Sequence, residues 1–159
     1  MTMITIKTYA GFELNVRRSS DQDGPLLEDF WKRVSPIDLD RRSKVGPHGG
    51  ACATTTFLAF GGSGLVAIAV LTTDLSSKHA TVMVFTDDRA TYHGVSWALL
   101  EHVLAEARNH GVQVVESVFG AQDIRASRLE QKMGFVEVPH PQTDGLKVLR
   151  WTLAETTSH

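Results

Sequence analysis

The sequence predicts an α/β domain built on one mixed sheet, part antiparallel and part parallel, that helices cover. Two observations carry this prediction. Three β-rich apolar runs follow one another within residues 56–86, with only short segments between them, which is typical of an antiparallel meander. From residue 94 onward the apolar period changes from two to about four, and helices then alternate with strands, which indicates a crossover and parallel pairing.

Two main elements are predicted in the N-terminal part. A strand is expected over Phe12–Arg17, because apolar and polar residues alternate there. A helix follows, because apolar residues recur at steps of three and four: Leu26, Leu27, Phe30, Trp31 and Val34. Ser20 or Asp21 can cap this helix, and Ser35-Pro36 ends it. A second short helix is predicted over residues 36–42, and a Gly-rich loop over residues 43–55.

The middle of the chain predicts a hairpin and a third strand. The apolar runs Phe57–Phe60 and Leu65–Thr72 are joined by Gly61-Gly62-Ser63-Gly64, which is a strong hairpin signal. Ala80–Thr86 is the next β-rich run, and it completes the meander.

The clearest helix of the chain spans Gly94–His110, where Val95, Leu99 and Val103 repeat every four residues and Gly111 can cap the end. A strand is predicted over Val112–Phe119. The remaining elements are a helix and two closing strands: Asp123–Met133, which Gly134 stops, Phe135–Val138 and Val148–Leu153.

The composition predicts a single globular domain over residues 1–159 and excludes several classes of protein. The formal net charge is −2, from 16 Lys and Arg against 18 Asp and Glu, which excludes a strongly basic nucleic-acid binder. The longest apolar run, Leu65–Leu71, is far shorter than the ~20 residues of a membrane span. Cys52 is the only cysteine, so neither an intramolecular disulfide nor a zinc site built from cysteines can form. Residues 1–12 lack the pattern of a secretory signal, and we expect a cytoplasmic protein.

The strand, turn and helix between residues 80 and 111 predict an anion-binding site. The first N–H groups of a helix have no acceptor within it, and the helix dipole favours negative charge at that end. Gly94, at the helix start, lets a pyrophosphate approach the backbone closely. A single glycine is far from a complete phosphate-loop pattern, so an ordinary strand-to-helix turn is the alternative.

The residues around this turn resemble the GNAT superfamily of acyl-coenzyme A-dependent N-acyltransferases. The family pattern (Arg/Gln)-x-x-Gly-x-(Gly/Ala), followed by a helix with paired leucines, falls on Thr91-Tyr92-His93-Gly94-Val95-Ser96 and Leu99-Leu100. A second pattern, an Asn about eleven residues before a Gly-Phe pair, falls on Asp123 and Gly134-Phe135. The opening GFELNVRRSSDQDGPLLEDFWKRVSP looks like the first strand and helix of domains related to bacterial protein acetyltransferases. The resemblance covers nearly the whole chain and implies a mostly antiparallel sheet of six to seven strands flanked by about four helices.

The resemblance implies acetyl-CoA as co-substrate and no metal. It places the donor against the strand, turn and helix start formed by Val82, Val84, Phe85, Thr91, Tyr92, His93, Gly94, Val95 and Ser96, with Asp123 nearby. A primary amine attacks the thioester carbonyl, a backbone N–H of residues 80–86 holds the oxyanion, and a general base takes the proton of the amine. The candidate bases are His79, Asp87, Asp88 and Glu116, and Tyr92 is a candidate acid.

Four positions depart from the family pattern: Thr91, Ser96, Asp123 and Glu130. Glu130 stands where many members carry the tyrosine that protonates the leaving thiolate, but we expect it to be a solvated helix carboxylate. A carboxylate protonates a thiolate only if its own pKa is raised well above the ordinary value.

The leading hypothesis is an acetyl-CoA-dependent N-acetyltransferase that acts on a small cationic amine, such as an aminoglycoside antibiotic or a polyamine. The mild acidity of the chain and its acidic first helix favour such an acceptor. A protein lysine is the alternative acceptor. A non-catalytic CoA-binding regulatory domain is the alternative function, and a protein-interaction domain that keeps only the fold is a third. No nucleic-acid or membrane partner is expected, and a homodimer is left open.

Overall fold

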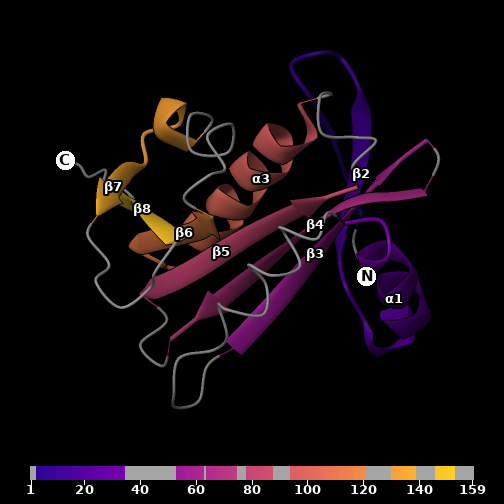
Figure 1. Cartoon of the computed structure of the whole chain (residues 1–159), viewed down its shortest axis with the longest axis horizontal. Helices are drawn as coiled ribbons and strands as arrows, with labels where there is room; N and C mark the ends of the chain where they lie inside the picture. The colour runs from indigo at the N-terminus through magenta and orange to yellow at the C-terminus, as the bar shows by residue number, and fades with distance from the viewer. Residues whose placement is uncertain are drawn as a thin grey trace.

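In the computed structural model of the chain, the described residues are 3–34, 53–62, 64–74, 78–87, 94–120, 130–138 and 146–152. The elements are β1 (Ile4–Lys7), β2 (Glu13–Arg18), the 3-10 turn η1 (Asp21–Asp23), α1 (Gly24–Trp31), β3 (Ala53–Gly61), β4 (Gly64–Thr73), β5 (His79–Thr86), α3 (Val95–Asn109), β6 (Val114–Gly120), β7 (Val136–Val138) and β8 (Leu146–Thr152). Residues 130–132 are also helical. The strands form one sheet in the order β1-β2-β3-β4-β5-β6-β8-β7 (Figure 1).

The predicted fold class is confirmed. Every neighbouring pair of strands is antiparallel except β5 and β6, which are parallel, so the sheet is mixed and mostly antiparallel. The described sheet has eight strands, one more than the six to seven expected. The additional strand is β1, which pairs with β2 from Ile4↔Val16 to Lys7↔Glu13.

One prediction of a loop is wrong. Residues 53–55 were expected to belong to the Gly-rich loop, but Ala53–Thr55 open β3 and pair with Thr73–Leu71 of β4. Long-range pairing with β4 makes this polar run a strand, although no alternation of apolar residues announces it. The predicted helix over 36–42, the remainder of the loop over 43–52 and the first residues of the helix over 123–133 lie outside the described residues.

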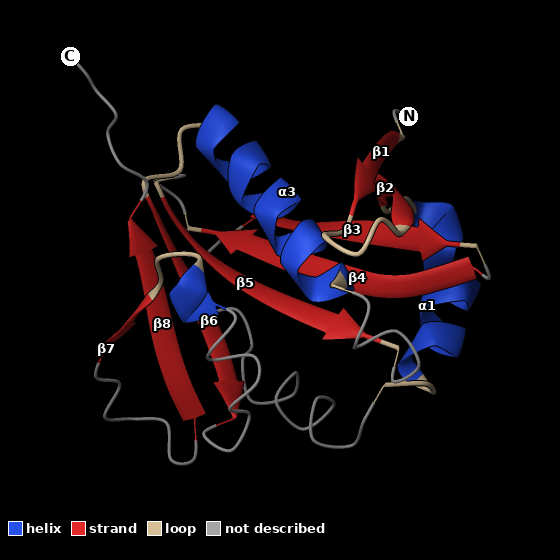
Figure 2. Ribbon diagram, turned by 90° about the horizontal axis from the view of Figure 1, so that it is seen from above, coloured by secondary structure: helices blue, strands red, loops and turns tan. Residues whose placement is uncertain are grey.

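Two apolar clusters fill the two faces of the sheet, one beneath α3 and the other beneath α1. The cluster below α3 joins Leu99 and Val103 of the helix to Ala67 and Ala69 of β4. The cluster below α1 joins Phe30 to other strand residues, among them Ile68, Phe85 and Leu58. Because successive residues of a strand point to opposite faces, β4 supplies both clusters and α1 and α3 lie on opposite sides of the sheet (Figure 2).

The long helix begins and ends as its sequence predicts. Gly94 is the N-cap of α3 in the left-handed conformation, with φ +73°. At the other end His110 is the C-cap, and Gly111 follows with φ +87°. The N–H of Val112 then donates to the carbonyl of Ala107 at 3.0 Å, which satisfies one of the last carbonyls of the helix. The predicted cap at Gly111 is confirmed.

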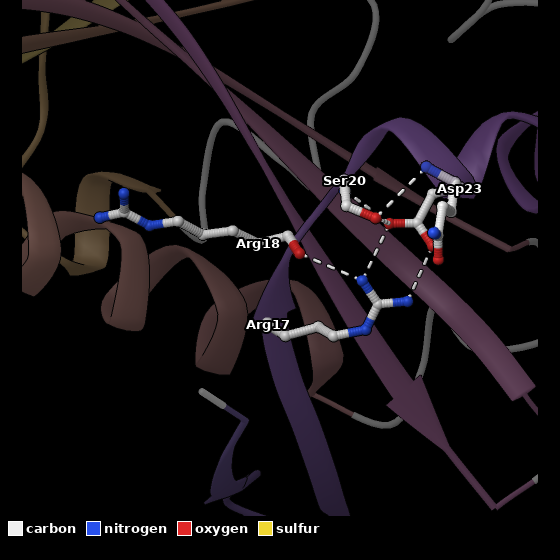
Figure 3. A network of polar contacts seen from close by, with 5 residues as sticks. Arg17, Arg18, Ser20 and Asp23 are labelled. Atoms are coloured by element: carbon white, nitrogen blue, oxygen red, sulfur yellow. Dashed lines mark hydrogen bonds and ion pairs between the residues drawn. The ribbon is translucent and has the colours of Figure 1, made fainter. Parts of the chain in front are cut away.

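A partly buried ion pair fixes the start of the first helix to the sheet (Figure 3). The guanidinium of Arg17 in β2 donates to both carboxylate oxygens of Asp23, at 2.8 and 2.9 Å. The Ser20 N–H also donates to Asp23, at 2.7 Å, and the Ser20 hydroxyl accepts from the Gln22 N–H at 3.3 Å. Ser20 is therefore the predicted cap, although it caps η1, which directly precedes α1.

This pair predicts a loss of stability in acid. The guanidinium of Arg17, and then the Ser20 N–H, hold the pKa of Asp23 well below its ordinary value. A carboxyl group with a lowered folded-state pKa stabilises the fold above its unfolded-state pKa, and this contribution is lost as the pH falls below about 4. Asp23→Asn is expected to lower the free energy of unfolding by about 2 kcal/mol at neutral pH. Urea unfolding at several pH values measures both effects.

The exposed neighbour Asp21 provides the matched control. Asp21→Asn should unfold at nearly the wild-type urea concentration throughout the pH range, because it removes a surface carboxylate. Asp23→Asn should also show a weaker dependence of stability on pH in acid than the wild type does. A slope for Asp23→Asn as steep as that of the wild type would show that other carboxylates cause the acid sensitivity.

Candidate active site

The parallel pairing of β5 and β6 is short, and the sheet divides where it ends. The two strands pair over four residue pairs, from His79↔Val114 to Val82↔Ser117. Both strands continue beyond this point, β5 to Thr86 beside β4 and β6 to Gly120 beside β8. Their first residues lie together and their ends point apart (Figure 2). We call this divergence beyond Val82 and Ser117 the fork.

The fork changes what the backbone of β5 faces. In a continuous sheet, every second peptide group of β5 takes a partner on β6, but beyond Val82 the two strands no longer pair. An extended molecule with amide groups of its own can take the place of the missing strand, as peptides do at sheet edges. Three of the predicted donor-binding residues lie here: Val82 and Val84 contact the cluster below α3, and Phe85 belongs to the cluster below α1.

The start of α3 provides the second feature of the site. No side chain of the described residues caps this end of the helix, and the first bond of the helical pattern runs from the Ala98 N–H to the Gly94 carbonyl at 3.2 Å. The N–H groups of Val95 and Ser96 precede this bond, so they have no acceptor within the helix. The first turn of α3 is therefore a place that favours an anion, as the sequence predicts.

Two of the candidate bases come together in the segment where β5 and β6 are paired, before the fork. His79 Nε2 lies 3.7 Å from Glu116 Oε1. The other oxygen of Glu116 accepts from Arg150 Nε at 3.0 Å and from Arg150 Nη2 at 2.7 Å. His79 is half-exposed, whereas most of the Glu116 side chain is covered. By the alternation of β5, where Ala80 faces α3, His79 lies on the opposite face of the sheet.

Asp87 lies apart from these two residues. Its carboxylate is buried at the far end of β5 and accepts from Arg33 Nε at 2.6 Å. Arg33 also donates to Asp29 and, at 2.9 Å, to the Leu65 carbonyl, and the Asp87 N–H donates to the Val66 carbonyl at 2.8 Å. This arrangement ties the end of α1 to the sheet. Sequence reasoning missed the role of Arg33, because 54 residues separate it from Asp87 and no local pattern joins them.

Glu130 is buried, so its interpretation as a solvated helix carboxylate is wrong. The hydroxyl of Ser117 donates to Glu130 Oε2 at 2.9 Å, and both side chains are almost inaccessible to water. Ser117 belongs to the last residue pair before the fork, and sequence reasoning did not single it out. The pair connects the helical residues 130–132 to β6 beside the candidate site.

The remaining predicted residues Asp88, Thr91, Tyr92, His93 and Asp123 lie outside the described residues. Within the part of the chain that the structure describes, no group of three or more His, Cys, Asp or Glu side chains is arranged to hold a metal ion. No helix in those same ranges combines the length and apolar character needed to cross a membrane.

Several solved N-acetyltransferases share this architecture. The GNAT domain of PAT from S. lividans superposes with a TM-score of 0.80 and 19% identity, over 95% of this chain and 97% of that one. The ribosomal-protein-S18-alanine N-acetyltransferase from Escherichia coli gives 0.68 and 20%, over 92% and 99% of the two chains. A spermidine N-acetyltransferase chimera from Vibrio cholerae and hSSAT gives 0.67 and 15%, over 87% and 95%.

The fold of the chain is therefore that of the GNAT N-acetyltransferases. No protein-family model matches the sequence, and a search of curated proteins finds no matching relative. At the identities given above, the likeness concerns the architecture alone.

Proposed function

We propose that this protein is an acetyl-CoA-dependent N-acetyltransferase that acts on a primary amine. The observation that carries the proposal is the fork, where β5 and β6 stop pairing after four residue pairs. Beyond this point β5 remains paired with β4, and β6 remains paired with β8. The amide-containing arm of the donor would lie along β5, beside Val82, Val84 and Phe85. Its phosphates would meet the backbone at the start of α3, at Gly94, Val95 and Ser96, with Thr91, Tyr92, His93 and Asp123 as further candidate contacts.

This placement gives the donor a direction. The phosphate end belongs at the start of α3, which follows the open end of β5 in the chain. The thioester end then points toward the closed end of the fork, at the last residue pair Val82↔Ser117. His79 and Glu116 lie in the paired segment that leads to that closed end, whereas Asp87 lies at the open end and is held by Arg33. We therefore favour His79 over Asp87 as the general base.

The chemistry needs one proton acceptor and one group for the oxyanion. The nitrogen of a neutral amine attacks the thioester carbon, the C–S bond breaks, and the products are an amide and the free thiol of CoA. His79 would take the proton that the amine gives up, and the carboxylate of Glu116, 3.7 Å away, would stabilise the imidazolium that results. A backbone N–H of β5 would hold the oxyanion. The thiolate takes up the proton in the end, from water or from Tyr92.

A small cationic amine is the acceptor that we favour, with polyamines and aminoglycosides as the classes to test. The net charge of −2 favours attraction of a cation. The acidic first helix supports this less than its sequence suggests, because Arg17 holds Asp23 and Arg33 holds Asp29. A fold shared with a spermidine N-acetyltransferase supports a polyamine, while the ribosomal-protein acetyltransferase with the same fold keeps a protein amine as the alternative.

Two broader assignments accompany this proposal. We treat residues 1–159 as one acyltransferase domain, because the superposition on the S. lividans GNAT domain covers 95% of the chain. A single cysteine is compatible with a reducing compartment, and we propose that the protein is located in the cytoplasm.

A thiol-release assay tests the function. The protein is incubated with acetyl-CoA and with spermidine, kanamycin or a lysine peptide, and free CoA is measured. Release that depends on one of the amines is expected, together with a melting temperature raised by about 5–10 °C at acetyl-CoA concentrations about 100 times the Kd. If the assay shows no release of CoA and the melting temperature does not rise, the proposal is contradicted. A thermal shift without release from any amine would instead favour the non-catalytic CoA-binding domain.

A further inference from the structure

An exposed aromatic ring lies on the start of α3. Tyr9, in the turn between β1 and β2, is 77% exposed, whereas Gly94, on which its ring lies, is buried. A Cβ added to Gly94 would lie 2.8 Å from Tyr9 Cε2 and 3.0 Å from Tyr9 Cζ, so the ring occupies the space that the glycine leaves free. Burial of apolar surface does not explain a tyrosine here, because most of the side chain remains in water.

The turn that carries Tyr9 is held by four hydrogen bonds. The N–H of Thr8 donates to the Phe12 carbonyl and the N–H of Gly11 donates to the Thr8 carbonyl, each at 2.9 Å. The buried hydroxyl of Thr8 accepts from the N–H groups of Ala10 and Phe12, at 3.2 and 3.1 Å. A side-chain oxygen that accepts from nearby backbone groups in this way stabilises a tight turn. These bonds hold the backbone beneath Tyr9 in place next to the start of α3.

We infer that Tyr9 is a positioning residue for the acyl donor, an inference that rests on the proposed function. Its ring packs on Gly94 and so restrains the first turn of α3, where the N–H groups of Val95 and Ser96 would bind the phosphates. N–H groups of the protein that are already held in place lose less conformational freedom when a ligand binds, and this makes binding tighter. The ring acts on the phosphate end of the donor, and the fork serves the thioester end separately.

Kinetics with two donors test this inference. Tyr9→Ala should raise the Kd and the KM for acetyl-CoA about three- to tenfold, while kcat at saturating donor stays unchanged. Tyr9→Phe keeps the ring and should behave as the wild type does. Acetyl-pantetheine has the thioester but no pyrophosphate, so the wild type and Tyr9→Ala should use it equally well. A purely structural role would shift the melting temperature without this difference between donors.

Two results would overturn the inference while the proposed function stands. One is a Tyr9→Ala variant that binds acetyl-CoA as tightly as the wild type. The other is an equal loss toward acetyl-pantetheine, because the ring would then act on the fork rather than on the start of α3. Wild-type protein that neither binds nor uses acetyl-CoA would contradict the proposed function itself, and the role of Tyr9 with it.

Discussion

Replacing Gly94 by alanine should weaken acetyl-CoA binding about tenfold or more in a protein that still folds. Gly94 is the N-cap of α3 at φ +73°, and a residue with a side chain pays about 1–2 kcal/mol in this left-handed conformation. The added Cβ would also lie 2.8 Å from Tyr9 Cε2, closer than non-bonded carbon atoms settle. Relief of this strain moves the first residues of α3 and displaces Tyr9. Titration calorimetry with acetyl-CoA measures the change in Kd.

Gly111→Ala is the matched control for this substitution. Gly111 follows the other end of α3 at φ +87°, and no described atom lies within 4 Å of the place that a Cβ would take. The variant should lose a similar free energy of unfolding through the same backbone strain, yet keep the wild-type Kd for acetyl-CoA. Equal Kd values for the two variants would contradict the start of α3 as the phosphate site.

Replacing His79 by glutamine is expected to lower kcat/KM for the amine about 100-fold near neutral pH. Glutamine forms hydrogen bonds but takes up no proton, so the step that makes the amine neutral is lost. The deficit should shrink toward about pH 9.5, because a larger fraction of the amine is then neutral without help. The Kd for acetyl-CoA should not change, since His79 lies on the face of the sheet opposite α3.

His110 is the control histidine for this experiment. It is exposed at the end of α3, where its Nδ1 lies 2.8 Å from the Glu106 carbonyl. His110→Gln should retain the wild-type kcat/KM at every pH. A His79→Gln variant that keeps the wild-type rate would remove His79 from the role of base. A deficit that does not shrink as the pH rises would do the same.

Elements with their own apolar periodicity were predictable from the sequence, and elements that depend on distant partners were not. The spacing of Val95, Leu99 and Val103 predicts α3, and all three residues are buried beneath it. β1 has no such signal: its four residues are mostly exposed, and pairing with β2 makes them a strand. Ala53–Thr55 likewise carry no apolar pattern, and β4 supplies their partners.

In the candidate site, too, local patterns were predictable from the sequence and contacts between distant residues were not. The sequence places Gly94 at a helix start, because a glycine before a helical period is a local pattern, and the structure confirms it as the N-cap of α3. His79 and Glu116 were predicted separately as candidates, but their proximity depends on the parallel register of β5 and β6. The fork itself has no counterpart in the sequence, since it is the place where that register ends. The contact of Tyr9 with Gly94 was not predicted either, because 85 positions of the sequence separate the two residues.

The position of α3 in the chain makes it part of the connection between two halves of the sheet. Among the described strands, β1 to β5 all precede α3, and β6 to β8 all follow it. The connection that contains α3 and the four residue pairs between β5 and β6 therefore both join these halves across the fork. Under the proposed function, a donor bound along β5 and at the start of α3 would lie beside both of these links.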